Sequence, residues 1–249
     1  NVGPGRLERL YEVLGHPTTG RLLLAWMKRI DLFVALSHAV EEVYRSRSFA
    51  GSRIEVVPNM IDPSFSVPET DRSDHDVRLL YVGSLTANKG VEYLIDAMRL
   101  LPPSYSLRIV GSGTRGAALG ARADRLGLSD RVDFAGQVPY DAIPSEYADA
   151  DVFVHPGVWP EPLNRTVLEA MQAGLPVVCT DIGGPPEVIP DKTLLCPPED
   201  AEALAATVRR ASDLGYEAGE QNRQYVRRHL APSVVVPQIV GLYEELIES

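Results

Sequence analysis

Short apolar runs alternate with segments of helical spacing between about residues 77 and 197. Runs that predict β-strands cover 77–83, 105–111, 132–135, 151–155, 176–180 and 193–196. Helices are predicted between them at 91–101, 117–128 and 166–173, with a shorter helical turn near 145–148. Strands that are apolar on both faces and separated by helices indicate a parallel sheet covered on both sides. The predicted fold class is therefore α/β, a doubly wound parallel sheet.

The two ends of the chain differ from this central pattern. The C-terminal 50 residues are predicted to be helical, with breaks at Pro232 and near Gly215. The front is predicted to contain a helix over 22–30, a strand over 32–37, a helix capped by Ser37 and running to about Phe49, and a strand over 54–58.

One strand–helix–strand unit is too small to form a domain. Residues 1–57 are therefore expected to be the remnant of an earlier domain, and 58–231 the Rossmann-like domain. Residues 232–249 are expected to form a C-terminal helix that packs back toward the front.

Composition excludes several classes of protein. The chain is 45% hydrophobic, enough for a sizeable core, and its formal net charge is −10. This acidity argues against nucleic-acid binding, which needs a basic patch. A phosphate ligand would have to be held by local donors, and the only lysines are Lys28, Lys89 and Lys192.

Targeting signals and cysteine chemistry add little. No apolar run reaches 18 residues, so no membrane-spanning helix is expected, and residues 1–20 lack a secretory pattern. Cys179 and Cys196 lack metal-ligand spacing. They are expected to be buried, reduced thiols in a cytoplasmic protein.

The strongest candidate chemistry is a pair of acids, Glu161 and Glu169, eight positions apart. A helix that begins near Asn164 would place Glu161 in the preceding loop and Glu169 about one and a half turns inside. Free backbone N–H groups at this helix end would point between the acids and attract an anion. The arrangement suits a ligand with both phosphates and hydroxyls, such as a nucleotide sugar. A carboxylate at 169, in an apolar helix, must either bond to hydroxyls such as a ribose diol or face solvent.

Loops after the predicted strands add further candidates. Gly83 would permit close backbone approach, Ser84 offers a hydroxyl, and Lys89 offers a charge for a phosphate, although a tight turn with a solvated lysine has the same pattern. The loop around Val138 could hydrogen-bond a nucleotide base or be an ordinary connection. His155 is more typical of a satisfied loop residue than of a catalyst, and Trp159 of packing.

The segment from Gly111 through Gly113 to Gly116 matches the dinucleotide-binding pattern G-x-G-x-x-G, with Asp133 about twenty residues later. However, it follows the second strand of the domain, and Asp133 lies within a strand rather than at its end. A loop that lines a nucleotide base pocket is favoured over a plain turn and over an NAD site. Asp149 and Asp151 have Asp-x-Asp spacing but begin a buried strand, so no metal site is expected.

Taken together, these features resemble the C-terminal half of a GT-B glycosyltransferase of the large retaining family 4. The resemblance covers about residues 32–249. It is carried, in chain order, by Ser37-His38-Ala39-Val40, Val56-Val57-Pro58-Asn59-Met60-Ile61-Asp62, Gly83-Ser84-Leu85 with Lys89-Gly90, Gly111-Ser112-Gly113, Glu161 with Glu169 as an E-x₇-E motif, and Ala173-Gly174-Leu175-Pro176-Val177-Val178.

The resemblance implies a role for each site residue. Glu161 would contact the donor sugar near the reacting carbon and Glu169 would hold the ribose hydroxyls. Lys89 would neutralise the departing diphosphate, and no metal or other cofactor is expected. Backbone N–H groups from Leu163, Asn164 and Arg165 would bind the sugar or the diphosphate. The predicted donor site also includes Gly83, Ser84, Gly111, Gly113, Val138 and Thr166.

The chain departs from the family pattern in three places. Ser84 stands where arginine is common, Leu163-Asn164 replaces the more usual Phe-Gly, and Met60 removes the glycine of the domain junction. In this family the acceptor domain would lie upstream of these residues, and any association with a membrane would be made through that domain. This chain alone is therefore expected to be inactive. The acceptor is a hydroxyl compound of unknown class. Three alternatives stay open: a UDP-sugar 2-epimerase, an NAD-dependent enzyme and a non-catalytic nucleotide-binding module.

Overall fold

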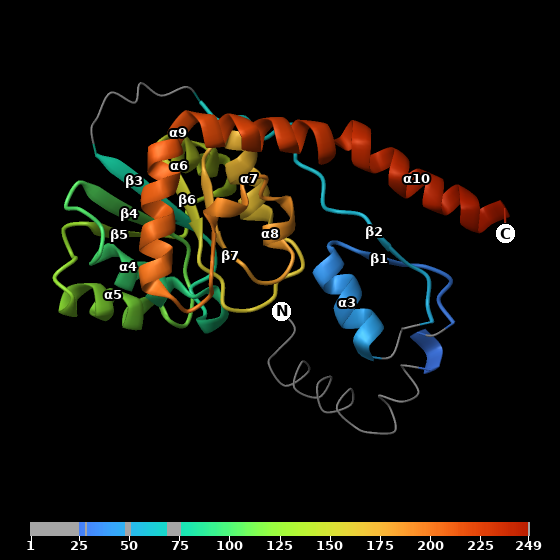
Figure 1. Cartoon of the computed structure of the whole chain (residues 1–249), viewed down its shortest axis with the longest axis horizontal. Helices are drawn as coiled ribbons and strands as arrows, with labels where there is room; N and C mark the ends of the chain where they lie inside the picture. The colour runs from blue at the N-terminus through green and yellow to red at the C-terminus, as the bar shows by residue number, and fades with distance from the viewer. Residues whose placement is uncertain (1–24, 28, 48–50, 69–75, 249) are drawn as a thin grey trace.

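A computed structural model describes residues 25–27, 29–47, 51–68 and 76–248 (Figure 1). Its main body is a six-stranded sheet in which every described pair of neighbouring strands is parallel. The strands are β3 (Val77–Val82), β4 (Tyr105–Val110), β5 (Val132–Gly136), β6 (Val152–His155), β7 (Val177–Thr180) and β8 (Leu195–Cys196).

The strand order is β5-β4-β3-β6-β7-β8, so the chain builds outward from β3 and then returns to continue from β6 on its other side. The carboxyl ends of β3 and β6 therefore lie next to each other where the order reverses. In open α/β sheets this is the place where ligands bind, because the loops on its two sides diverge. The predicted doubly wound parallel sheet is confirmed.

Helices cover the sheet because their apolar faces match the apolar faces of the strands. The α-helices of this body are α4 (Val91–Met98), α5 (Gly116–Arg125), α6 (Ile143–Ala148), α7 (Arg165–Ala173), α8 (Pro185–Val188) and α9 (Ala201–His229). Three 3₁₀ turns join them: η1 (Ala87–Lys89), η2 (Tyr140–Ala142) and η3 (Lys192–Leu194). The short α8 lies outside the predicted helices, because four residues that begin with two prolines show no helical period. Of the predicted strand over 193–196, the first two residues belong to η3 and only the last two pair with β7.

The front of the described chain is a small separate unit (Figure 1). Strands β1 (Phe33–Ala35) and β2 (Ile54–Val56) pair in parallel, and α3 (His38–Arg47) lies between them in the chain. Ala35 and Ile54 form a small core. Of the helix predicted over 22–30, residues 25–27 are helical, and most of its remainder lies outside the described residues. The predicted end of the next helix, at 48–49, also lies outside them.

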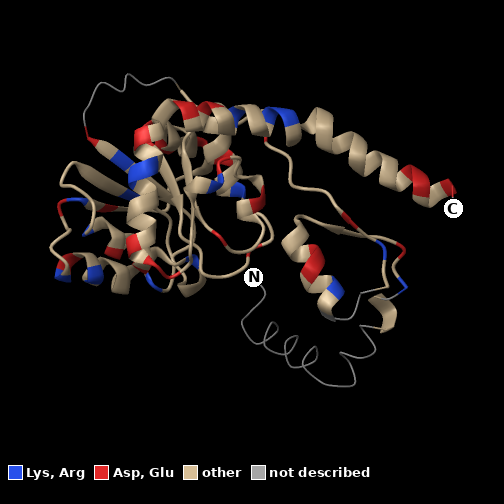
Figure 2. Ribbon diagram, viewed as in Figure 1, with Lys and Arg blue, Asp and Glu red and all other residues tan. Residues whose placement is uncertain are grey.

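Two long helices close the chain, with the breaks that were predicted. Gly215 has non-helical backbone angles inside α9 (φ 46°, ψ −123°), and α10 (Pro232–Glu248) begins at the expected proline. Figure 1 shows α10 running from the sheet body toward the front unit, and Arg53 pairs there with Glu245 at 2.6 Å. In Figure 2, the charges of α10 are confined to its C-terminal end.

The low charge of α10 is relevant to the prediction that the chain has no membrane-spanning helix. The α9–α10 segment contains an 18-residue stretch that is long and apolar enough to cross a membrane by length and composition, and 11% of it is buried in this structure. The stretch was not recognised from the sequence because prolines and uncharged polar residues interrupt its apolar run. A single helix that passes this test is weak evidence for a membrane protein.

An acid from the sheet body caps the helix of the front unit. Glu187 in α8 accepts hydrogen bonds from the amides of His38 (2.9 Å) and Ala39 (2.8 Å) at the start of α3. The predicted cap is also present, since the Ser37 hydroxyl accepts from the amide of Val40 (3.3 Å). A negative charge at a helix N-terminus satisfies unpaired donors and interacts favourably with the helix dipole. Glu187 therefore connects the two units of the chain.

We expect Glu187→Ala to lower the free energy of unfolding by about 1–2 kcal/mol, because two helix-terminal donors lose a charged acceptor. Urea denaturation measures this loss, and hydrogen exchange should show faster exchange in α3. Glu217→Ala, at an exposed position of α9, is the control and should change neither. Unchanged exchange in α3 would contradict the role of Glu187.

Candidate functional site

The loops after β3 and β6 meet where the strand order reverses. The amide of Val158 donates to the carbonyl of Asn88 (3.0 Å), which joins the two loops directly. Gly90, with φ of +65°, makes this approach possible, since a Cβ there would lie 2.0 Å from the carbonyl oxygen of Pro156. The close contact brings η1 and its last residue, Lys89, beside the loop that carries Glu161.

Lys89 and Glu161 form an ion pair in this crevice. The Lys89 ammonium lies 2.7 Å from Oε2 of Glu161, and both side chains are mostly buried, at 17% and 14% exposed. The Asn164 amide donates to the same oxygen (2.9 Å). The other oxygen, Oε1, is buried and has no hydrogen-bond partner among the described residues. A buried acceptor without a donor is costly, so this oxygen is an available binding position for a ligand hydroxyl.

Helix α7 begins beside this pair, as predicted. Asn164 is its N-cap, and its side chain accepts from the amide of Thr166 (3.0 Å). The cap therefore occupies the Thr166 amide, which the sequence placed in the donor site. In the part of the chain that the structure describes, the amides of Leu163, Asn164 and Arg165 have no acceptor. These three donors and the Lys89 ammonium form a positively polarised surface suited to an anion.

Glu169 lies inside the same helix and is buried, with a side chain that is 7% exposed. It does not face solvent, and protein donors satisfy it: Oε1 accepts from Tyr140 (3.1 Å) and Arg165 Nε (3.0 Å), and Oε2 accepts from Tyr147 (3.1 Å). Burial and the neighbouring Glu169 carboxylate raise the pKa of both tyrosines, which keeps them protonated as donors. The burial of this carboxylate therefore does not require a ligand.

Tyr140, Tyr147 and Asp62 were not predicted as neighbours of the site. A signal for the tyrosines existed: a carboxylate in an apolar helix needs donors, and two tyrosines lie seven residues apart, one in η2 and one in the last turn of α6. No local pattern indicates Asp62, whose carboxylate lies 3.8 Å from Arg165 across 103 positions of chain.

Four predicted residues line one pocket of about 610 Å³ beyond the ends of β3, β4 and β5: Gly83, Ser84, Gly111 and Val138. Gly111, with φ of +134°, is needed because a Cβ there would lie 1.9 Å from the carbonyl oxygen of Gly83. A Cβ on Gly113 would likewise lie 2.4 Å from the carbonyl oxygen of Leu85. These glycines thus let two loops pack together and shape a hollow that backbone groups line.

In the structure, the acid of the dinucleotide-binding pattern does not lie near the glycine loop. Asp133 pairs in the sheet with Arg108, near the start of β5, and the two side chains form an ion pair. The glycine loop lies at the opposite end of the strands, after Val110. Asp133 is therefore directed to Arg108 rather than to a ribose near Gly111, which agrees with our interpretation that this is no NAD site.

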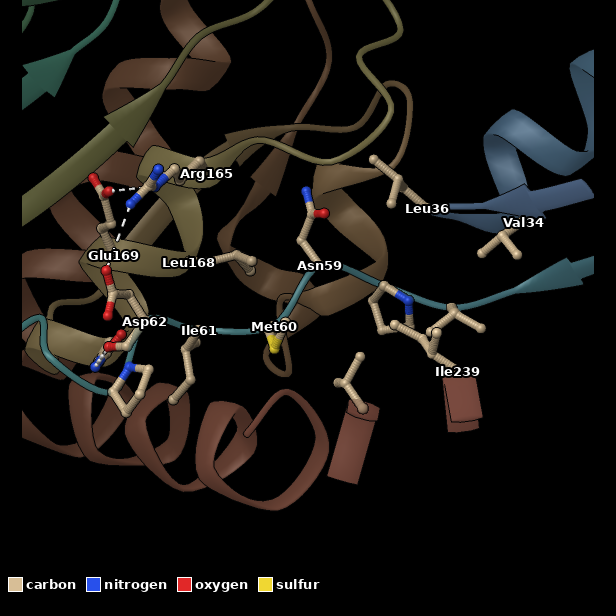
Figure 3. A pocket seen from close by; sticks show the side chains of 15 residues that line it. Val34, Leu36, Asn59, Met60, Ile61, Asp62, Arg165, Leu168, Glu169 and Ile239 are labelled. Atoms are coloured by element: carbon tan, nitrogen blue, oxygen red, sulfur yellow. Dashed lines mark hydrogen bonds and ion pairs between the residues drawn. The ribbon is translucent and has the colours of Figure 1, made fainter. Parts of the chain in front are cut away.

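A second pocket, of about 600 Å³, lies between the two units (Figure 3). Its apolar wall includes Val34, Leu36, Leu168 and Ile239, and Asp62, Arg165 and Glu169 lie together at its polar end. The segment that joins β2 to β3 is the linker between the two units. Gln172 fixes this linker by donating to the carbonyls of Asp62 (2.8 Å) and Phe65 (3.0 Å).

His155 and the cysteines are buried near the site. Burial lowers the pKa of His155 to about 4, although the nearby Glu161 opposes this shift. Cys179 and Cys196 are free and buried, as predicted, and burial raises the pKa of both thiols. Asp151 accepts from the amide of Arg78 (2.8 Å), and the described residues contain no group of three or more potential metal ligands.

Residues 65–229 match the family model described as Glycosyl transferases group 1. An uncharacterized glycosyltransferase of Methanocaldococcus jannaschii is 37% identical over 148 residues, 57% of this chain and 38% of that protein. Sucrose-phosphate synthase from Thermosynechococcus elongatus has a TM-score of 0.82 at 27% identity, over 96% of this chain and 65% of its own. HepE of Anabaena, solved with UDP, has a TM-score of 0.81 at 25% identity, over 92% of this chain and 68% of its own. The chain thus spans only part of the length of these proteins.

We expect Gly90→Ala to lower the free energy of unfolding by more than about 2 kcal/mol, because it combines a positive φ with a clash against the Pro156 carbonyl. Gly120→Ala is the matched control: it lies in α5 with open space around it and should stabilise the chain slightly. Equal effects in urea denaturation would show that the approach of the two loops does not depend on Gly90.

The His155 pKa predicts a pH dependence of stability. Its folded pKa, about 4, lies below the ordinary value of 6.5, so the unfolded chain binds a proton first. The neutral His155 side chain contributes its full stabilisation above pH 6.5. This contribution to the free energy of unfolding decreases by up to about 3 kcal/mol as the pH falls toward 4. Unfolding free energies at pH 7.5 and 4.5 should fall less steeply in His155→Asn than in the wild type. The exposed His38→Asn should keep the wild-type slope, and equal slopes in all three proteins would contradict the prediction.

Proposed function

This chain belongs to the Glycosyl transferases group 1 family, and we propose that it is the donor-binding half of a retaining family 4 glycosyltransferase. The reaction would pass a hexosyl group from a UDP- or GDP-sugar to a hydroxyl acceptor. The bond from the anomeric carbon to the diphosphate breaks, a bond to the acceptor oxygen forms with retention, and the proton of the acceptor hydroxyl passes to the departing diphosphate. Residues 58–231 would hold the donor, while 1–57 and the helix 232–249 would belong to the acceptor side.

The observation that supports this proposal is the Lys89–Glu161 ion pair beside the free amides of α7. A nucleoside diphosphate needs donors for its phosphates, and Lys89 with the amides of Leu163, Asn164 and Arg165 supplies them without a metal. Negative charge that develops on the departing diphosphate would be stabilised by the same groups, which are already in place before the reaction. When Lys89 turns to the phosphates, Glu161 becomes free to bind the sugar hydroxyls.

The two neighbouring features fit the rest of such a donor. The pocket lined by Gly83, Gly111 and Val138 offers backbone groups to a base, and Glu169 is the acceptor for ribose hydroxyls. HepE, which has the same fold, was solved with UDP and with UDP-glucose. We therefore propose that a nucleotide lies across the carboxyl ends of β3, β4 and β5, with its diphosphate at Lys89 and its sugar beside Glu161.

Titration calorimetry of the chain with UDP, GDP and NAD tests the proposal. We expect binding of UDP or GDP, and we expect Lys89→Gln to weaken it about tenfold or more, because a charge-assisted hydrogen bond contributes about 1.5–3 kcal/mol. Binding of the corresponding nucleoside should be unchanged, since it lacks the phosphates.

Lys192→Gln is the control for this experiment. This lysine donates to the carbonyl of Pro186 (2.7 Å) before β8, and its loss should leave nucleotide binding unchanged. NAD binding with no response to UDP or GDP would refute the proposal.

A further inference from the structure

The Glu169 carboxylate has little capacity left for a ligand. A carboxylate offers about four lone-pair positions. Oε1 already accepts from Tyr140 and Arg165, and Oε2 accepts from Tyr147. The position that is left, on Oε2, lies on the oxygen held by the fully buried Tyr147. A ribose has two adjacent hydroxyls, so a nucleotide can use Glu169 fully only if a protein donor leaves.

The donors on Oε1 are the ones able to leave. Tyr140 is 51% exposed and the Arg165 side chain is 63% exposed, whereas Tyr147 is buried and its single hydroxyl proton lies between Glu169 Oε2 and the carbonyl of Thr166, both at 3.1 Å. Tyr140 and Arg165 also hold each other: Arg165 Nη2 lies 2.5 Å from the Tyr140 hydroxyl, and its guanidinium stacks 5.0 Å from the centre of the tyrosine ring. We call these two side chains the Tyr140–Arg165 cover.

We propose that the Tyr140–Arg165 cover occupies the ribose position of Glu169 in the empty protein and exchanges with the ribose hydroxyls when a nucleotide binds. This inference rests on the proposed donor site. The exchange reduces the preference for a ribonucleotide over a nucleotide whose sugar lacks the two hydroxyls, because only the ribonucleotide has to displace Tyr140 and Arg165 from Glu169. Tyr140 is suitably placed, since it directly follows Pro139 in the wall of the base pocket.

Asp62 provides a second acceptor for the displaced arginine. Its carboxylate lies 3.8 Å from Arg165 Nη2 and is partly exposed, within the linker between the two units. Figure 3 shows Asp62 and Glu169 both close to Arg165. When ribose takes the Glu169 oxygen, Arg165 would move to Asp62 and keep a paired charge. Nucleotide binding would thereby be communicated to the linker, which Gln172 holds against the same helix.

The experiment first measures the dissociation constants of UDP and GDP from the chain. It then measures the dissociation constant of the 2′,3′-dideoxy analogue of whichever nucleotide binds more tightly. Tyr140→Phe keeps the ring and removes the competing hydroxyl. It should tighten binding of the ribonucleotide by about threefold to tenfold, because the hydrogen bond that it removes joins a half-exposed hydroxyl to the Glu169 carboxylate, and leave the dideoxy analogue nearly unchanged. Asp62→Asn should weaken ribonucleotide binding severalfold, because the displaced Arg165 loses its alternative charged partner. Tyr216→Phe, exposed on α9, is the control and should match the wild type.

The outcomes separate this inference from the proposed function. A wild type that binds UDP or GDP while Tyr140→Phe binds equally or more weakly overturns the exchange and leaves the donor site standing. Equal tightening of the ribonucleotide and the dideoxy analogue also overturns it, because the ribose hydroxyls would then not be the competing groups. A wild type that binds neither UDP nor GDP overturns the proposed function and this inference with it.

Discussion

The site depends on the close approach of two loops where the strand order reverses. Gly90 against the Pro156 carbonyl allows that approach, and it places the charge of Lys89 2.7 Å from Glu161. Because both side chains are mostly buried, their interaction is screened less than that of a surface pair. The ion pair holds a cation and an acid at the start of α7 before any ligand arrives. The lysine is thereby kept beside the amides that would bind the diphosphate of the proposed donor, although it would have to leave Glu161 to reach the phosphates.

A second constraint is the buried Glu169. A carboxylate in an apolar helix must be compensated, and three protein donors compensate it here. The same oxygens are required for the ribose of the proposed donor. The protein donors that stabilise the empty protein and the ribose hydroxyls of the proposed donor would therefore compete for the same two carboxylate oxygens. Exposed donors on one oxygen and a buried donor on the other let the site serve both needs.

Much of the fold could be predicted because local pattern and tertiary arrangement agree in the sheet body. Each strand predicted over 77–155 is present within a residue or two, since apolar runs bounded by turns are clear signals. The two-residue β8 and the four-residue α8 were poorly predicted or missed, because elements this short have no period. At the site, the start of α7 near Asn164 was predicted correctly from the apolar period, whereas the Asn164 cap was found only in the structure. The partners of Glu169 were not, since they come from other segments.

The sequence by itself determined the α/β class, the family, the start of α7 and the set of polar residues near the strand ends. The class and the start of α7 follow from periodicity, the polar residues from their spacing after the strands, and the family from the resemblance of short motifs, all of which are local along the chain. Only the tertiary structure decided that Lys89 pairs with Glu161, that Asp133 turns to Arg108, and that Tyr140 and Arg165 cover Glu169. Those contacts join residues up to 72 positions apart. Their formation depends on strand order and loop packing, and no local pattern of side chains encodes either one.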